Sequence, residues 1–105
     1  MLRNADALAA IIQHHPQVER ILCGHVHRAV QTRFAGTIAQ IPPGVAHQVK
    51  LTLGEGRGSW TMEPPGFLLH CWTSADGLVT HQIPIGSFEP EGAFSDPPIG
   101  EPVDL

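Results

Sequence analysis

The stretch Cys23-Gly24-His25-Val26-His27-Arg28 places two histidines one residue apart, directly after the short apolar run Val18–Cys23. Neutral imidazole is a common metal ligand in proteins. On an extended backbone, the side chains of residues i and i+2 point to the same side. The glycine before the pair favours a turn at the end of the apolar run. The sequence therefore predicts a strand followed by a loop from which His25 and His27 reach one metal site.

A zinc site formed by Cys23, His25 and His27 is the sharper alternative for this stretch. Its spacing differs from that of structural zinc modules, and no fourth ligand follows nearby. The chain has two cysteines, Cys23 and Cys71, and both fall in predicted strands. Because this is not a small scaffold dense in disulfides, we expect both thiols to be reduced and buried.

The segment Ile21-Leu22-Cys23-Gly24-His25-Val26-His27-Arg28 resembles the last metal-binding motif of the calcineurin-like metallophosphoesterases, Gly-His-x-His. Two later segments are similar to those that follow this motif in the cyclic-nucleotide and glycerophosphodiester phosphodiesterase branch. They are Pro42-Pro43-Gly44-Val45-Ala46-His47-Gln48 and Glu63-Pro64-Pro65-Gly66-Phe67-Leu68-Leu69-His70. The resemblance implies the C-terminal part of a four-layer α/β/β/α sandwich.

The other motifs of that family are missing from this sequence. The family builds a two-metal site from Asp-x-His, Gly-Asp-x-x-Asp, Gly-Asn-His-Asp or Glu, an isolated His and Gly-His-x-His. The chain contains no Asp-x-His, no Gly-Asp and no Asn-His. We therefore expect no complete catalytic set in this chain, and weak or partial binding of the two divalent ions (Mn, Fe or Zn) that the complete enzyme uses.

The resemblance assigns a separate role to each candidate site residue. His27 is expected to join the metal held by the Asp-x-His motif, and His25 the other metal. His47, about twenty residues downstream, is expected beside the metals and in contact with substrate phosphate, with a strand-start histidine that has a backbone partner as the close alternative. Arg28 is the second candidate for binding phosphate, against the alternative of an exposed arginine without a specific role.

Two functions from different classes follow from these observations. The first is the C-terminal segment of a metal-dependent phosphodiesterase that hydrolyses cyclic nucleotides or glycerophosphodiesters, a segment that is inactive or poorly active alone. The second is a non-catalytic β-rich assembly module with a relic or structural metal site. In both, we expect uncovered sheet faces to associate with a missing N-terminal part or with another copy of the chain.

Composition excludes several other classes. The chain has 105 residues, an apolar fraction of 42% and a net charge of −4. It has no basic patch of the kind that nucleic-acid binding needs. No apolar run approaches ~18 residues, and no signal-peptide segment follows Met1, so we expect a cytoplasmic protein. Residues 86–105 hold five acids, four prolines and no Lys or Arg, which predicts a disordered tail after a partial domain at residues 1–85.

Hydrophobic patterning predicts one helix followed by strands and hairpins, a β-rich α/β fragment. The helix is expected over Asn4–His15, with Asn4 as N-cap and Pro16 as its stop. Hairpins are expected where alternating runs flank turn residues. The predicted strands are Val18–Cys23 (buried on both faces near its end), Val30–Phe34, Thr37–Ile41, Gln48–Leu53, Ser59–Met62, Phe67–Trp72 (covered on both sides) and Leu78–Ile85.

Overall fold

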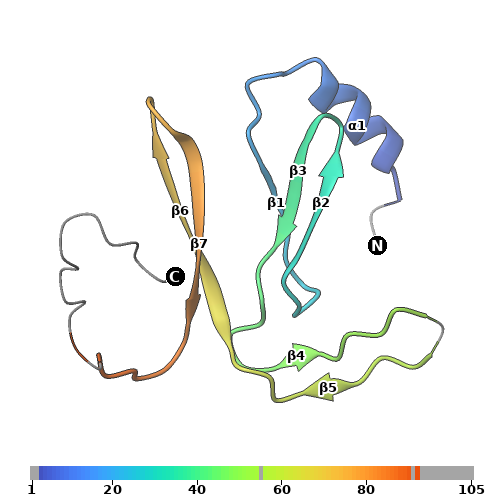
Figure 1. Ribbon diagram of the computed structural model, residues 1–105. Coiled ribbons are helices and arrows are strands. Elements are labelled where there is room, and N and C mark those ends of the chain that lie inside the picture. The colour runs from blue at the N-terminus through green and yellow to red at the C-terminus, as the bar shows by residue number, and fades with distance from the viewer. Residues whose placement is uncertain (1–2, 55, 91, 93–105) are drawn as a thin grey trace, which may run out of the picture.

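The computed structural model describes residues 3–54, 56–90 and 92 (Figure 1). Within them lie a single helix and seven strands in three separate sheets. The elements are α1 (Ala5–Gln13), β1 (Ile21–Leu22), β2 (Val30–Phe34), β3 (Thr37–Ile41), β4 (Gln48–Val49), β5 (Trp60–Thr61), β6 (Gly66–Thr73) and β7 (Gly77–Pro84). This content agrees with the expected β-rich α/β fragment.

The N-terminal helix forms where its periodicity predicts it. α1 starts one residue after Asn4, which occupies the N-cap position without a side-chain capping bond. Asp6 lies in the first turn, where a carboxylate interacts favourably with the positive end of the helix dipole. The helix closes at His14, two residues before Pro16. The expected span Asn4–His15 is therefore right to within two residues at each end.

The first hairpin is confirmed with the predicted bounds. β2 and β3 pair antiparallel, with Phe34 opposite Thr37. The two residues between them, Ala35 and Gly36, have φ angles of 52° and 85°. Positive φ at both central positions is the type I′ arrangement, whose twist matches that of the flanking strands.

The strand expected over Val18–Cys23 is shorter and more exposed than predicted. β1 is confined to Ile21–Leu22 and pairs parallel with β3, giving the sheet order β1-β3-β2. Leu22 is 57% exposed, so the expected burial on both faces is wrong. Cys23 follows β1 and is a free, exposed cysteine, and Cys71 on β6 is exposed as well. The thiols are thus unpaired as expected, but they are not buried.

The second sheet is smaller than the sequence indicates. β4 covers only Gln48–Val49 of the predicted strand Gln48–Leu53, and it pairs antiparallel with the two-residue strand β5. Leu51 and Leu53 are 58% and 92% exposed. Alternation along these residues predicted a buried face, but within the described chain no layer lies against that face.

The third sheet is the hairpin of β6 and β7, which pair over their full length from Gly66↔Pro84 to Thr73↔Gly77. The hairpin confirms the predicted pairing, but the expected cover on two sides is wrong. Phe67, Leu69 and Cys71 share one face of β6 and are all exposed. Leu68 and His70, on the opposite face, are half-buried.

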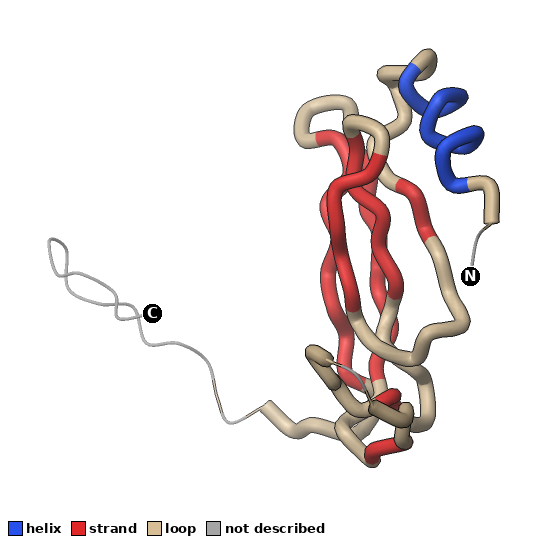
Figure 2. The backbone as a smooth tube through the Cα atoms, turned by 90° about the vertical axis from the view of Figure 1, so that its right-hand side faces the viewer, coloured by secondary structure: helices blue, strands red, loops and turns tan. Residues whose placement is uncertain are grey.

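Polar contacts connect this hairpin to the first sheet. Arg20 donates to the Gln40 side chain on β3 at 2.7 Å and to the Thr80 hydroxyl on β7 at 2.8 Å. His70 on β6 shares the same hydroxyl at 2.8 Å. The two ribbons accordingly stand side by side in Figure 1 and overlap in the perpendicular view of Figure 2, while β4 and β5 lie beneath them. The hydrogen bonds of Arg20 therefore link the first sheet to the β6–β7 hairpin.

Apart from Pro43, no apolar side chain is buried in residues 3–54, 56–90 and 92, which the structure describes. The buried residues there are Pro43, Gly44, Gln48 and Gly66. They gather where the end of β3 and the start of β6 meet β4. The most enclosed point of the chain is therefore polar and backbone-rich, and it adjoins the histidine loop.

Two further expectations bear on parts of the chain at its edges. The predicted tail, residues 86–105, lies outside the described residues except for 86–90 and 92. Among the described residues, no helix has the length and apolar character to cross a membrane.

We expect the isolated chain to unfold without a sharp cooperative transition, because burial of apolar side chains is the main stabilising term in folding. Scanning calorimetry should show a broad, weak transition, and a hydrophobic dye should fluoresce on the native sample. A sharp transition with an enthalpy of about 60–80 kcal/mol, typical of a domain of this size, would contradict this expectation.

Candidate metal-binding loop

The loop after β1 presents both candidate ligands on a left-handed backbone. His25 and His27 have φ angles of 77° and 56°. The backbone is therefore not extended, and the expectation that both side chains point the same way because of an extended chain is wrong. Gly24 does not have a left-handed φ, and a Cβ there would meet no atom within 4 Å. The turn is thus made by the histidines themselves and not by the glycine.

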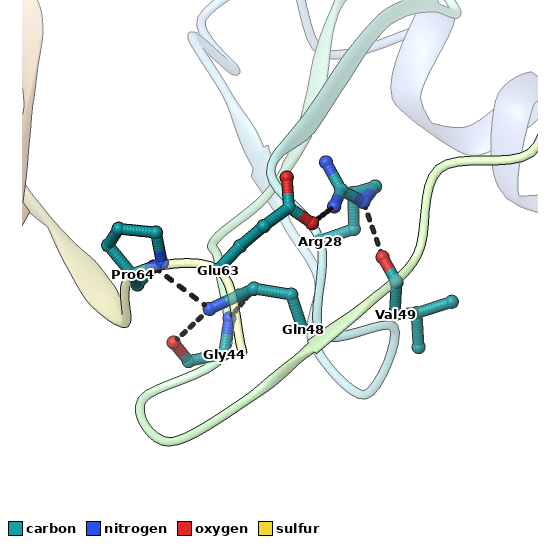
Figure 3. Close-up of polar contacts among 6 residues, drawn as sticks. All are labelled: Arg28, Gly44, Gln48, Val49, Glu63 and Pro64. Carbon is teal, nitrogen blue, oxygen red and sulfur yellow. Dashed lines mark hydrogen bonds and ion pairs between the residues drawn. The ribbon is translucent and has the colours of Figure 1, made fainter. Parts of the chain in front are cut away.

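Left-handed φ at a residue with a Cβ costs roughly 1–3 kcal/mol and persists only where neighbours impose it. Here the neighbours are the residues of β4. The amide of Val49 donates to the carbonyl of His27 at 2.8 Å. The Arg28 side chain also bonds to Val49, since its Nε donates to the Val49 carbonyl at 2.6 Å. Figure 3 draws this contact as a dashed line. These bonds fix the C-terminal half of the loop against β4.

Arg28 makes a second contact that occupies its guanidinium. Its Nη2 forms an ion pair with the Glu63 carboxylate, which precedes β6 (Figure 3). The Arg28 side chain is 20% exposed and that of Glu63 is 50% exposed. Arg28 therefore joins three segments: the histidine loop, β4 and the connection from β5 to β6. A role in binding phosphate remains a prediction for this residue.

Gln48 anchors the neighbouring segment. It is 4% exposed, and its side-chain amide lies against the backbone of Gly44. Gln48 Oε1 accepts from the Gly44 amide at 2.7 Å, and Nε2 donates to the Gly44 carbonyl at 2.8 Å. Nε2 also donates to the Pro64 carbonyl at 3.3 Å. Figure 3 shows Gln48 between Gly44 and Pro64 with these contacts as dashed lines. The amide of Gly66 donates to the same Gly44 carbonyl at 3.1 Å.

This anchoring brings the rings of His27, His47 and Trp60 together. The imidazoles of His27 and His47 stack with centroids 5.1 Å apart and an angle of 11° between their planes. The Trp60 indole packs edge-on against both, at 4.3 Å from His47 and 5.4 Å from His27. The centroid separations of His27 from His47 and from Trp60 are in the range favoured by aromatic pairs, and that of His47 from Trp60 is slightly shorter. We call these three residues the ring cluster.

Gly44 closes the remaining side of His27. A Cβ on Gly44 would lie 3.1 Å from His27 Nδ1 and would collide with the backbone oxygen of His47. His27 Nδ1 is buried and has no hydrogen-bond partner within the described chain. A buried imidazole nitrogen without a partner is costly unless it is satisfied by a ligand or by water. The Nδ1 atom of His27 would therefore be satisfied if its lone pair coordinated a divalent metal ion.

The described residues form no complete metal site. No group of three or more His, Cys, Asp or Glu side chains is arranged there to hold an ion. The alternative of a Cys23, His25 and His27 zinc site consequently has no support in the geometry. His25 is exposed, whereas His27 is half-buried in the ring cluster. Within the described residues, this loop therefore offers at most a pair of imidazoles to a metal ion.

Sequence reasoning identified four residues of this region and missed three. It singled out His25, His27, Arg28 and His47, and the structure brings His27 and His47 into contact. It gave no role to Gly44, Gln48 or Trp60. Gly44 and Gln48 both lie in the family-like segment 42–48, so that motif was the available signal. For Trp60, no sequence signal pointed to the histidines.

Comparison with known proteins gives the chain its context. No protein-family model matches it. It is 39% identical over 85 residues to a probable glycerophosphodiester phosphodiesterase GpdQ from Arcobacter nitrofigilis, a match that covers 80% of this chain and 31% of that protein. It is 37% identical over 68 residues to the glycerophosphodiester phosphodiesterase GpdQ from Enterobacter lignolyticus, covering 64% of this chain and 24% of that protein. The chain thus spans less than a third of the length of these relatives.

We expect Gly44→Ala to disturb the loop, because the added Cβ meets the His47 backbone and the His27 ring. Overpacking of this kind costs about 1–3 kcal/mol, so the amides of Gly66 and Val49 should exchange at least about five-fold faster. Hydrogen exchange followed by NMR measures this.

The matched control for Gly44→Ala is Gly24→Ala, which adds the same methyl group where no atom lies within 4 Å. Equal exchange rates in the two variants would show that the close approach at Gly44 does not constrain the loop.

Proposed function

We propose that this chain is the C-terminal part of a metal-dependent phosphodiesterase. Its similarity to the two glycerophosphodiester phosphodiesterases supports the proposal and agrees with the resemblance to the calcineurin-like metallophosphoesterase family. The observation that carries the proposal is the pair of left-handed histidines, His25 and His27, in a Gly-His-x-His motif. Backbone strain at candidate ligands, held in place by neighbouring bonds, is characteristic of functional sites.

In this proposal, His25 and His27 each supply an imidazole to one of two divalent ions. Two-metal sites provide Lewis-acid polarisation and nucleophile activation for phosphodiester hydrolysis. His47, which stacks on His27, is proposed to contact a substrate phosphate next to the metals. Arg28 adds positive charge beside this region, although its guanidinium is shared with Glu63. Imidazole ligands suit iron and zinc, whereas manganese prefers oxygen ligands, which other residues of the site would have to supply.

The substrate class in this proposal is a small phosphodiester, such as a glycerophosphodiester or a cyclic nucleotide. Residues 1–85 would form part of a larger domain, a four-layer α/β/β/α sandwich completed by protein outside this chain. The exposed apolar face of β6, with Phe67, Leu69 and Cys71, supports the need for a further layer. The whole enzyme would thus assemble its site from two regions of the fold.

We expect the chain alone to bind Mn²⁺ or Zn²⁺ only weakly, because two histidines fall short of the ligand number of a catalytic site. Calorimetric titration should show binding that is lost in the double variant His25→Ala/His27→Ala. His81→Ala is the control, because His81 is an exposed histidine on β7. Equal binding by the wild-type chain and the double variant would exclude the two histidines from the site.

We expect no hydrolysis of bis(p-nitrophenyl) phosphate above background by the chain alone. Two-metal hydrolysis needs both ions held at about 3.5–4 Å from each other. The unmatched region of the Arcobacter nitrofigilis relative, joined to this chain, should restore metal-dependent turnover. His27→Ala in that chimera should then reduce turnover at least about 100-fold, while His81→Ala should not.

The activity assay separates the two candidate functions. An active chimera that depends on His27 would support the phosphodiesterase. A folded but inactive chimera would favour the non-catalytic assembly module. Turnover by the purified 105-residue chain, lost on His25→Ala, would contradict the expectation of an incomplete site.

A second consequence is that the isolated chain should self-associate through its uncovered faces. Sedimentation at micromolar concentration should show a dimer or larger species. Replacing Phe67 and Leu69 by Thr should weaken association, whereas Leu53→Thr, which removes apolar surface from a loop, should not. A monodisperse monomer would contradict this expectation.

A further inference from the structure

Trp60 is a large apolar residue whose position is not explained by a core. Its residue surface is 64% exposed, and it lies on β5, a strand of only two residues. The packed part of its indole meets the imidazoles of His47 and His27. Trp60 therefore packs against two histidine rings while most of its own surface remains exposed.

The pairing of β5 with β4 determines this position. Trp60 lies opposite Val49, the residue whose amide binds the His27 carbonyl. Val49 thus holds the backbone of His27 while its cross-strand partner covers the ring of His27. On the other side of the ring lies Gly44, where an added Cβ would come within 3.1 Å of His27 Nδ1. The imidazole of His27 is consequently restrained by Gly44, by the stacked ring of His47 and by the edge of Trp60.

Restraint of this kind affects metal affinity. A ligating histidine binds best when its ring is already oriented, and loss of an orienting partner typically lowers metal affinity about 10–100-fold. Hydrogen bonding is the usual means of orientation, but Nδ1 of His27 has no partner in the described chain. Ring packing is the restraint that the structure shows for this imidazole.

We propose that Trp60 is a positioning residue, which orients His27 and His47 toward the metal and the substrate phosphate. This inference rests on the proposed function, because it assumes that His27 is a metal ligand. Trp60 itself touches neither metal nor substrate in this account. Its contribution is geometric, and any aromatic ring of similar width at this position would supply most of it.

Binding of Co²⁺ to the full 105-residue chain tests the proposal by calorimetry. Trp60→Ala should weaken Co²⁺ binding about ten-fold, and Trp60→Phe should recover most of the affinity. Trp72→Phe is the matched control, because Trp72 is also exposed, at 63%, and its Nε1 contacts Glu19 at 3.2 Å. If Trp60→Ala binds as the wild-type chain does while His27→Ala abolishes binding, the positioning role is wrong and the proposed function stands.

A second measurement needs no metal. Histidine ring protons of His27 and His47 should be shifted by the indole ring current in the wild-type chain and in Trp72→Phe. These shifts should collapse toward random-coil values in Trp60→Ala and persist in Trp60→Phe. Unshifted histidine rings in the wild-type chain would overturn the inference even if Co²⁺ does not bind. If His27→Ala binds Co²⁺ as tightly as the wild-type chain, the proposed function fails independently of Trp60.

Discussion

The hydrogen bonds between the side-chain amide of Gln48 and the backbone of Gly44 are the constraint on which this region depends. They satisfy both polar groups of a buried glycine and both polar atoms of a buried side chain. Because an unpaired buried polar group costs about 1–3 kcal/mol, the amide can be buried only with this complete set of partners. The same Gly44 carbonyl accepts the first amide of β6. The end of β3, β4 and β6 are thereby joined at one point.

The position of His27 follows from this joint. Gln48 places Gly44 against the His27 ring, and the next residue, Val49, binds the backbone of His27 and the side chain of Arg28. One dipeptide therefore controls both the space beside the imidazole and the path of the loop that carries it. A loop held in this way does not depend on an apolar core, which the described residues lack.

What the sequence could predict follows from the range of the interactions involved. The hairpins of β2–β3 and β6–β7 depend on alternation and on the turn residues between neighbouring strands, so they were predictable. Burial depends on which layer lies over a strand, and alternation along Gln48–Leu53 cannot show whether that layer exists. The expected burial of Cys23 and Cys71 is wrong for the same reason. Position in a predicted strand does not establish burial when a face of the sheet is open.

In the candidate site, too, the sequence predicts local features but not those that depend on contacts between distant segments. The motif identified His25 and His27, but residue spacing does not determine φ, so the left-handed backbone could not be predicted. The stacking of His47 on His27 was anticipated only as proximity to the metals. Trp60 comes from a separate short strand, and its contact with both rings depends on the register of β5 against β4. A register between two-residue strands has no pattern long enough to detect in the sequence.

Backbone strain also bears on whether the motif is functional or a relic. Two left-handed residues separated only by Val26 together cost about 2–6 kcal/mol, estimated from the per-residue cost of such conformations. The bonds from Val49 to His27 and from Arg28 to Val49 and Glu63 offset that cost on the C-terminal side of the loop. A loop without a ligand to bind would be expected to lose such a conformation as substitutions relax it. The described structure keeps both histidines at left-handed φ, with His27 Nδ1 buried and without a hydrogen-bond partner, and these two features support the proposed functional site over a relic.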